Sequence, residues 1–372
     1  MAEILEPDVN FIKQIRGLGG VSLNVCYQCA TCATVCPLST DDKPFPRREM
    51  IWGQWGLKDK LIKDPNIWLC HYCNDCSIYC PRGARPGDVM ASLRAYTISE
   101  YARPKFLAKW LQDKKYLPLL LAIPVAWFLF LIGITSGFHI PEAEEVVELT
   151  KFASSLWVVD LTFVSLSMLI VASFFFGVRD FWNDIKTVDL TPEQIAARGG
   201  WLNMIIPPIK EILLHNRFFK CGEKNIRFYF HFLILWGFVG LFIVTNILFF
   251  RTWVWPGIEE PLSLMHPVKW LANAAGMALL LGSLILLYDR IRDRETPSTY
   301  FDWSLVILVL ALAVTGFLTE IFRMLKVPSW ACLFYFTHLV SVFYLFAYLP
   351  FSKLAHLVYR TVAMIYERYE SV

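Results

Sequence analysis

The sequence is poor in charge and has no apolar leader at its N-terminus. Asp, Glu, Lys and Arg make up only 18% of its 372 residues, and the net charge of +3 is too small to indicate a nucleic-acid partner. Residues 1–10 include three acidic side chains and no apolar run, so no signal peptide is expected. The chain also lacks a flavin-binding fingerprint and a nucleophile motif. Because 56% of the residues are hydrophobic, the shortage of charge favours a membrane protein.

Cysteine, in contrast, is concentrated in one region. Eight of the ten cysteines lie between residues 26 and 80, in two copies of the pattern C-x2-C-x2-C-x3-C-P. This is the bacterial run for [4Fe–4S] clusters, in which three cysteines wrap one cubane and the fourth ligates the other cluster. We therefore assign one cluster to Cys26, Cys29, Cys32 and Cys80, and the other to Cys70, Cys73, Cys76 and Cys36. Structural zinc and disulfides are the alternatives, but neither calls for this spacing twice with a proline after each fourth cysteine.

The segments around the motifs predict helices. Between Cys36 and Cys70 lie 33 residues, too many for a tight β-hairpin ferredoxin. Residues 47–62 and residues 88–100 place apolar side chains near helical spacing. The patterns predict an all-α protein, whose first domain, residues 1–105, is an α-helical ferredoxin with two [4Fe–4S] clusters.

Long uncharged runs follow from residue 117 onward and predict a second domain, residues 106–372, with six transmembrane helices. The predicted spans are 117–138, 156–178, 228–250, 268–288, 303–322 and 333–356. Nineteen Lys and Arg side chains flank these spans on the side of the first domain, against five on the other side. The positive-inside rule therefore predicts a multi-pass protein of the inner membrane whose termini and iron–sulfur domain are cytoplasmic.

Histidines at membrane depth predict haem b. His338 and His356 are 18 residues apart. On one continuous helix this is about five turns, or about 27 Å, so both side chains would face the same way near opposite surfaces. His231 matches the depth of His356, and His266 matches that of His338. We therefore pair His231 with His356 at an inner haem and His266 with His338 at an outer haem.

Two cations near these histidines are candidates for binding roles. Arg227 lies one turn before His231 and could pair with a haem propionate, although a snorkelling interfacial arginine would look the same. Lys269 lies at the outer boundary, where a quinone headgroup would dock, although a lysine there is also a common interfacial anchor. His139 and His215 fall outside the spans, and we expect them at the interface.

The segments CYQCATCATVCP and WLCHYCNDCSIYCPRG resemble the small iron–sulfur subunit of heterodisulfide reductases. The remainder is similar to their cytochrome b subunit and, in helix order and in the His338/His356 pair, to the gamma subunit of respiratory nitrate reductases. The fusion of both parts resembles the C subunit of quinone-interacting membrane-bound oxidoreductase (Qmo) complexes over nearly the whole chain. One departure concerns the opposing histidines, which a single helix supplies in the nitrate reductase pattern, whereas the third span here offers only His231.

The resemblance implies an electron-transfer subunit without a catalytic residue of its own. Electrons would pass between (mena)quinone and heterodisulfide-reductase-A-like flavoprotein subunits, via haem b and the two clusters. In sulfate reducers, complexes of this kind serve adenylylsulfate reductase, so a role in sulfate respiration is expected. The alternatives are a membrane subunit of a heterodisulfide or sulfite reduction system, and a haem-free membrane anchor for a ferredoxin module.

Overall fold

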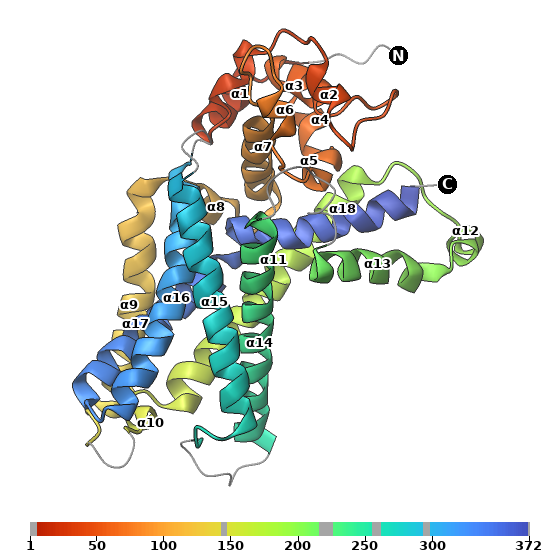
Figure 1. The fold of residues 1–372 in the computed structure, drawn as a ribbon. Coiled ribbons are helices and arrows are strands. Elements are labelled where there is room, and N and C mark those ends of the chain that lie inside the picture. Colours follow the sequence, from red (N-terminus) through yellow and green to blue (C-terminus); the bar gives the residue numbers. More distant parts are fainter. Residues whose placement is uncertain (1–5, 143–146, 216–225, 255–261, 293–297, 371–372) are drawn as a thin grey trace.

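The computed structural model describes residues 6–142, 147–215, 226–254, 262–292 and 298–370. Within these ranges all regular structure is helical, in agreement with the predicted all-α fold. Figure 1 shows two levels, in which a group of short N-terminal helices lies above a bundle of long helices. Both chain ends lie on the side of the short helices (Figure 1).

The N-terminal level is built from short helices around one longer, buried helix. These elements are α1 (Val9–Gly17), η1 (Val21–Val25), α2 (Thr31–Thr34), α3 (Arg47–Gln54), α4 (Lys58–Ile62), α5 (Asn66–Leu69), α6 (Asp75–Ile78) and α7 (Pro86–Tyr101). Most residues of α7 are buried, because α1, α4, α5 and α6 all pack against it. Pro86 is the first residue of α7, a position whose backbone N–H has no partner within a helix, so the N–H that proline lacks is not missed there. The helix is thus the common support of this level.

Six long apolar helices form the second level, as the sequence predicts. They are α9 (Leu117–Ser136), α11 (Leu161–Ile185), α14 (Ile226–Val254), α15 (Pro267–Arg292), α16 (Tyr300–Met324) and α17 (Pro328–Tyr348). Each is long and apolar enough to cross a bilayer. Only 17% to 33% of the apolar stretch in each helix is buried inside the protein. Such extensive exposure of apolar side chains indicates a multi-pass membrane protein.

Shorter helices connect and flank the bundle. Helices α8 (Lys105–Gln112) and η2 (Lys114–Tyr116) precede α9, and α10 (Leu149–Phe152) and η3 (Ser155–Asp160) precede α11. Helices α12 (Pro192–Ala197) and α13 (Gly200–Leu214) follow α11. After α17 come η5 (Leu349–Phe351), η6 (Lys353–Ala355) and α18 (His356–Glu370). Helices α13 and α18 pack against each other and extend sideways from the upper part of the bundle (Figure 1).

The sixth predicted span, residues 333–356, is wrong at its C-terminal end. Helix α17 stops at Tyr348, and two short 3₁₀ turns separate it from α18, which begins at His356. Pro350 explains the break, because proline cannot donate to the helical hydrogen-bond ladder. His338 and His356 therefore lie on two different helices, and continuous helical turns do not align them.

Glycines allow α14 and α15 to approach each other closely. A Cβ atom built on Gly237 of α14 would lie 3.0 Å from the carbonyl oxygen of Ala275, and one built on Gly282 of α15 would lie 2.9 Å from Ile234. Small residues have this role in membranes, where close packing drives helix association. The contact holds α14 in place, and with it His231 in the second turn of that helix.

The core of the N-terminal level includes residues from the membrane half. The ring centroid of Trp68 on α5 lies 5.1 Å from that of Tyr359 on α18 and 6.1 Å from that of Phe181 on α11. All three side chains are fully buried. The predicted boundary at residue 105 therefore does not separate two independent cores, because α18 and the end of α11 complete the core of the first domain.

A buried carboxyl pair lies between α3 and the segment that precedes α5. Glu49 is fully buried, and Arg48 donates to its Oε1 through Nε at 3.1 Å and through Nη2 at 2.9 Å. The same Nη2 group is 3.5 Å from Asp64 Oδ2. Burial, followed by the negative charge of Asp64, raises the pKa of Glu49 to about 9. Near neutral pH the site therefore holds a protonated Glu49 beside Asp64.

We expect Glu49→Gln to make the stability of the protein less dependent on pH. Native Glu49 keeps a proton that an unfolded glutamate, with a pKa of about 4.3, releases. The free energy of unfolding of the wild type should therefore fall as pH rises from about 4.3 to about 9, by up to about 1.4 kcal/mol per pH unit. Glutamine keeps a neutral donor and cannot ionise, so its profile should be flatter.

Thermal midpoints of the detergent-solubilised variants across this pH range measure the effect. The exposed Glu193 supplies a matched control, and Glu193→Gln should follow the wild-type profile. A wild-type midpoint that rises steadily with pH would contradict the protonated state of Glu49.

Candidate iron–sulfur and histidine sites

The two cysteine motifs fold in the same way. Gln28 and Ala30 in the first motif, and Tyr72 and Asn74 in the second, have positive φ angles between 56° and 71°. Non-glycine residues adopt this conformation rarely and at a cost, so its recurrence at matching places marks a required loop shape. Each loop leads into a short helix, α2 or α6, and the Tyr72 N–H donates to Cys70 Sγ at 3.4 Å. Backbone of this kind turns its amides toward a bound anion.

One recess receives cysteines from both motifs. Its thiols are those of Cys26, Cys29, Cys32 and Cys80. Arg47 and Arg82 also line this first recess, and Arg47 Nε is buried without a hydrogen-bond partner. A buried guanidinium N–H beside four thiols fits an anionic group, and a [4Fe–4S] cluster held by four thiolates is such a group.

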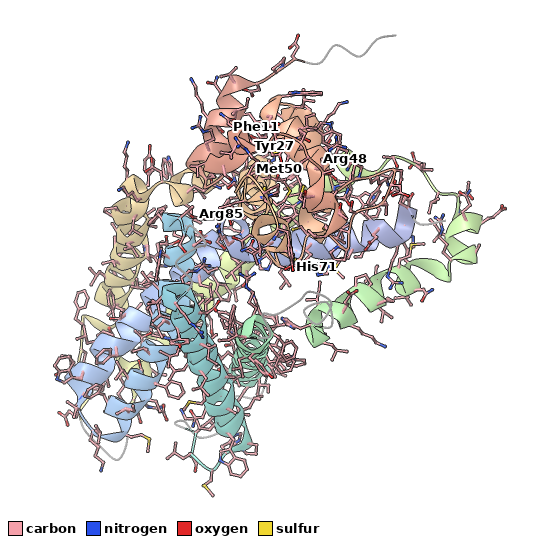
Figure 2. The ribbon with its side chains drawn as sticks, turned by 45° about the horizontal axis from the view of Figure 1, so that its top comes forward. Phe11, Tyr27, Arg48, Met50, His71 and Arg85 are labelled. Carbon is pink, nitrogen blue, oxygen red and sulfur yellow. The ribbon has the colours of Figure 1, made fainter. Side chains whose placement is uncertain are left out.

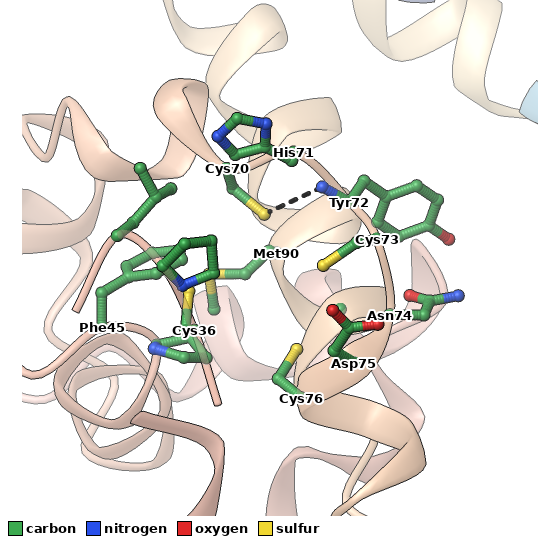
Figure 3. A pocket seen from close by; sticks show the side chains of 14 residues that line it. Cys36, Phe45, Cys70, His71, Tyr72, Cys73, Asn74, Asp75, Cys76 and Met90 are labelled. Carbon is green, nitrogen blue, oxygen red and sulfur yellow. Dashed lines mark hydrogen bonds between the residues drawn. The ribbon is translucent and has the colours of Figure 1, made fainter. Parts of the chain in front are cut away.

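Figure 3 shows the second recess. Its thiols are those of Cys36, Cys70, Cys73 and Cys76. Phe45 and Met90 form an apolar part of the wall beside Cys36 (Figure 3). Each recess thus collects three cysteines of one motif and the fourth cysteine of the other, which is the grouping that the spacing predicts.

Iron fits these sites chemically. Burial raises the pKa of Cys32 to about 12 and that of Cys36 to about 11, and neighbouring thiols act in the same direction. Without a metal these cysteines therefore stay protonated near neutral pH, whereas a coordinated metal deprotonates a thiol outright. In the part of the chain that the structure describes, no three His, Cys, Asp or Glu side chains are arranged to hold a single metal ion, as structural zinc would require. Each recess supplies the four thiols that a [4Fe–4S] cubane requires.

Three histidines meet where the bundle joins the N-terminal level. His231 on α14 and His215 at the end of α13 have ring centroids 6.4 Å apart. His356, the first residue of α18, is close enough for a charge on its ring to act on His231. Burial lowers the pKa of His356 to about 4, so its imidazole is neutral near pH 7. Its Nδ1–H donates to the carbonyl of Lys353, which leaves Nε2 as the ligand atom, an arrangement common among metal-binding histidines.

His215, expected at the interface, is instead part of this histidine group. The residue is buried, and the ring centroids of Phe228 and Phe232 lie 6.2 Å and 5.9 Å from its own. Helix α13 ends at Leu214, so no helical repeat relates His215 to His231 on α14. The packing of α13 against α14 brings the two rings together. No pattern in the sequence could have found this neighbour.

The structure does not bring His266 and His338 together. His338 lies halfway along α17, where its Nδ1 is 3.0 Å from Thr315 Oγ1 on α16. His266 precedes α15, and its Nδ1 accepts from the N–H of Val268 at 3.2 Å, as a helix cap does. Helix α16 packs against both α15 and α17. The outer haem pair stays a prediction, and its two histidines lie at different depths in the bundle.

Arg227 and Lys269 both have protein partners. Arg227 Nη1 donates to the carbonyl of Tyr72, and its guanidinium lies 5.5 Å from the centroid of that ring. Lys269 Nζ is 2.8 Å from Glu320 Oε2. The propionate role of Arg227 and the quinone role of Lys269 stay predictions. One side chain is tied to the second cysteine motif, and the other to a carboxylate near the opposite end of the bundle.

Comparison with known proteins agrees with the cysteine motifs. Residues 22–84 match a family model described as a 4Fe-4S dicluster domain. Over 102 residues, 27% of this chain and 52% of the relative, the sequence is 38% identical to the C subunit of the H(2):CoB-CoM heterodisulfide,ferredoxin reductase of Methanothermobacter marburgensis. The chain thus spans about half the length of this relative. Its N-terminal part is an iron–sulfur domain whose cysteines hold two [4Fe–4S] clusters.

Other relatives extend over the membrane helices. Citrate utilization protein B of Escherichia coli is 26% identical over 370 residues, 92% of this chain and 89% of the relative. The E subunit of the dihydromethanophenazine:CoB–CoM heterodisulfide reductase of Methanosarcina thermophila is 24% identical over 259 residues, 60% of this chain and 97% of the relative. No solved structure matches the chain.

The chain therefore joins an iron–sulfur domain to six helices that are long and apolar enough to cross a membrane. More particularly, it joins a dicluster domain like the C subunit of heterodisulfide reductases to a six-helix region that resembles their E subunit and citrate utilization protein B.

Proposed function

We propose that this chain carries electrons between a membrane quinone, such as menaquinone, and flavoprotein subunits in the cytoplasm. The observation that carries the proposal is a shared junction between the histidines and the second recess. Arg227 lies one turn before His231 on α14, and Arg360 lies one turn after His356 on α18. Both arginines donate to backbone carbonyls of the second cysteine motif. Two helices with candidate haem ligands therefore contact the loop that would hold one cluster.

At this junction His231 and His356 would hold haem b as the inner ligands. When bound, haem b takes up and releases single electrons. His215 is a third candidate, because its ring centroid is 6.4 Å from that of His231. Either His215 or His356 would hold the haem iron together with His231. His215 and His356 are thus rival second ligands.

Two further roles belong to the far half of the bundle. A second haem between His266 and His338 would need both rings at one depth, and the two residues contact different neighbours. A quinone at Lys269 would lie beside Glu320, a carboxylate that would exchange one of the two protons that reduction of a quinone to a quinol consumes. Haem quantification and quinol oxidation by a Lys269→Ala variant test these two roles.

We infer a complex of the Qmo type, in which heterodisulfide-reductase-A-like flavoproteins pass electrons toward adenylylsulfate reductase in sulfate respiration. The fused architecture supports this inference, and so do relatives named as heterodisulfide reductase subunits, which imply partner subunits of that kind. The excess of Lys and Arg on the side of the iron–sulfur domain supports its cytoplasmic location.

A second candidate is a membrane subunit of a heterodisulfide-type reductase, which the names of the relatives favour. Both candidates give this chain the same electron-transfer role and differ in the partner. Purification of the complex from native membranes separates them, since the first predicts flavin-containing partners and the second a separate catalytic subunit rich in cysteine.

A dithionite-reduced minus oxidised visible spectrum, with haem and iron quantified, tests the proposal. We expect a b-type α-band, one or two haems per chain, and about eight irons from two [4Fe–4S] clusters. A quinol analogue should reduce the haem. About eight irons without haem would contradict the quinone-linked function and leave a ferredoxin module on a membrane anchor.

A further inference from the structure

Two arginines from distant helices meet on one ligand residue of the second cysteine motif. We call residues Cys70–Cys73 the cluster loop. Arg94 of α7 donates through Nη2 to the carbonyl of Cys70 at 3.0 Å, and Arg360 of α18 donates to the same oxygen at 3.2 Å. Because Cys70 is a proposed cluster ligand, both guanidinium groups lie a short distance from its thiolate.

A third arginine holds the same loop from the membrane bundle. Arg227 of α14 donates to the carbonyl of Tyr72, and the guanidinium groups of Arg227 and Arg94 lie 5.5 Å and 5.9 Å from the centroid of that ring. Arg94, Arg227 and Arg360 together form what we call the arginine clamp. It ties the cluster loop to both helices that carry candidate haem ligands.

Three fixed positive charges at this loop have an electrostatic consequence. A [4Fe–4S] cluster with four thiolate ligands is an anion and gains a further negative charge when it is reduced. Arginine is always protonated, and the three side chains are partly buried, where charge interactions are stronger than in water. The clamp therefore stabilises the reduced cluster more than the oxidised one. Net charge and hydrogen bonding are the factors that set such potentials.

We propose that the arginine clamp makes the cluster of the second recess the membrane-side cluster and raises its reduction potential. The first recess faces the other way, since Cys29 is exposed and Tyr27 is 57% exposed. In Figure 2, His71 of the cluster loop lies beside α18, whereas Tyr27 lies farther from it, among the N-terminal helices. The first recess is thus the surface-side site. The inference rests on the cluster ligands and not on haem or quinone.

Arg82 provides a matched control at the first recess. It lines that recess, and its guanidinium lies 5.6 Å from the ring centroid of Tyr27. Replacing Arg82 should change the potential of the first cluster only, as replacing Arg360 should change that of the second only. The two substitutions remove the same charge and differ in the cluster that they face.

A redox titration of the purified chain, followed by the electron paramagnetic resonance of the reduced clusters, measures the effect. Arg360→Gln, which removes the charge and keeps a donor, should lower the midpoint potential of one cluster and leave the other unchanged. Arg360→Lys, which keeps the positive charge, should restore most of the wild-type midpoint potential. Arg82→Gln should lower the potential of the other cluster. Because the readout is a cluster potential, the absence of haem would leave this test valid.

The inference is overturned if Arg360→Gln moves neither potential, or if Arg360→Gln and Arg82→Gln move the same one. If Arg360→Gln does not assemble its clusters, Arg227→Gln takes its place in the test. Arg227 acts on the neighbouring carbonyl of the loop, so an unchanged pair of potentials in Arg227→Gln would then refute the proposal.

Discussion

Leucine at His231 is expected to remove the inner haem b from the purified protein. His231 lies on a helix that glycines hold tightly against α15, and its ring lies beside His215 and within electrostatic reach of His356. Leucine has no lone pair for iron. Loss of the outer partners of metal ligands already costs about 10–100-fold in affinity, so loss of a ligand should lower the affinity for the inner haem by more than about tenfold.

Matched substitutions then identify the second ligand. We expect His356→Leu to lose the inner haem as well, because the hydrogen bond from its Nδ1 to the Lys353 carbonyl leaves its Nε2 for iron. His215→Leu should retain haem, and the reverse pattern would make His215 the ligand. The exposed His139 supplies a control, and His139→Leu should keep the wild-type spectrum. A full haem complement in His231→Leu would contradict a haem site at this junction.

The same measurement addresses the outer haem. If a second haem is present, His338→Leu and His266→Leu should each lower the haem content from two per chain to one. Unchanged haem content would leave His338 as a partner of Thr315 and His266 as a helix cap.

Alanine at Cys36 is expected to remove the cluster of the second motif, although Cys36 belongs to the first motif in the sequence. Its thiol lies in the recess of Cys70, Cys73 and Cys76. Non-haem iron should fall from about eight to about four per chain, and the resonance signal of one reduced cluster should disappear. Cys80→Ala should remove the other cluster by the same reasoning.

Double substitutions distinguish this crossed arrangement from an uncrossed one. Cys36→Ala combined with Cys76→Ala should still leave one cluster, because both thiols line the same recess. Cys36→Ala combined with Cys26→Ala should leave none. An uncrossed arrangement predicts the opposite result for each pair. Cys332, buried on α17 and outside both recesses, is the control, since Cys332→Ala should keep all the iron.

The histidine site was harder to predict than the cysteine sites because it depends on where helices end. The interval of 18 residues between His338 and His356 implies one face only if the helix is continuous, and Pro350 interrupts it. His231 could be predicted as a site residue, because an ionisable side chain in an apolar span is costly and therefore indicates a function. His215 could not be singled out, since its burial depends on how α13 packs.

By itself, the sequence determined the dicluster domain and the six membrane helices that follow it. Both depend on local constraints, because ligands of one cubane must be closely spaced and a bilayer core requires about 20 apolar residues. Only the tertiary structure decided that Trp68 packs on Tyr359 and that Arg360 reaches Cys70, a residue 290 positions away. Such contacts follow from the packing of helices against one another, which no spacing along the chain encodes.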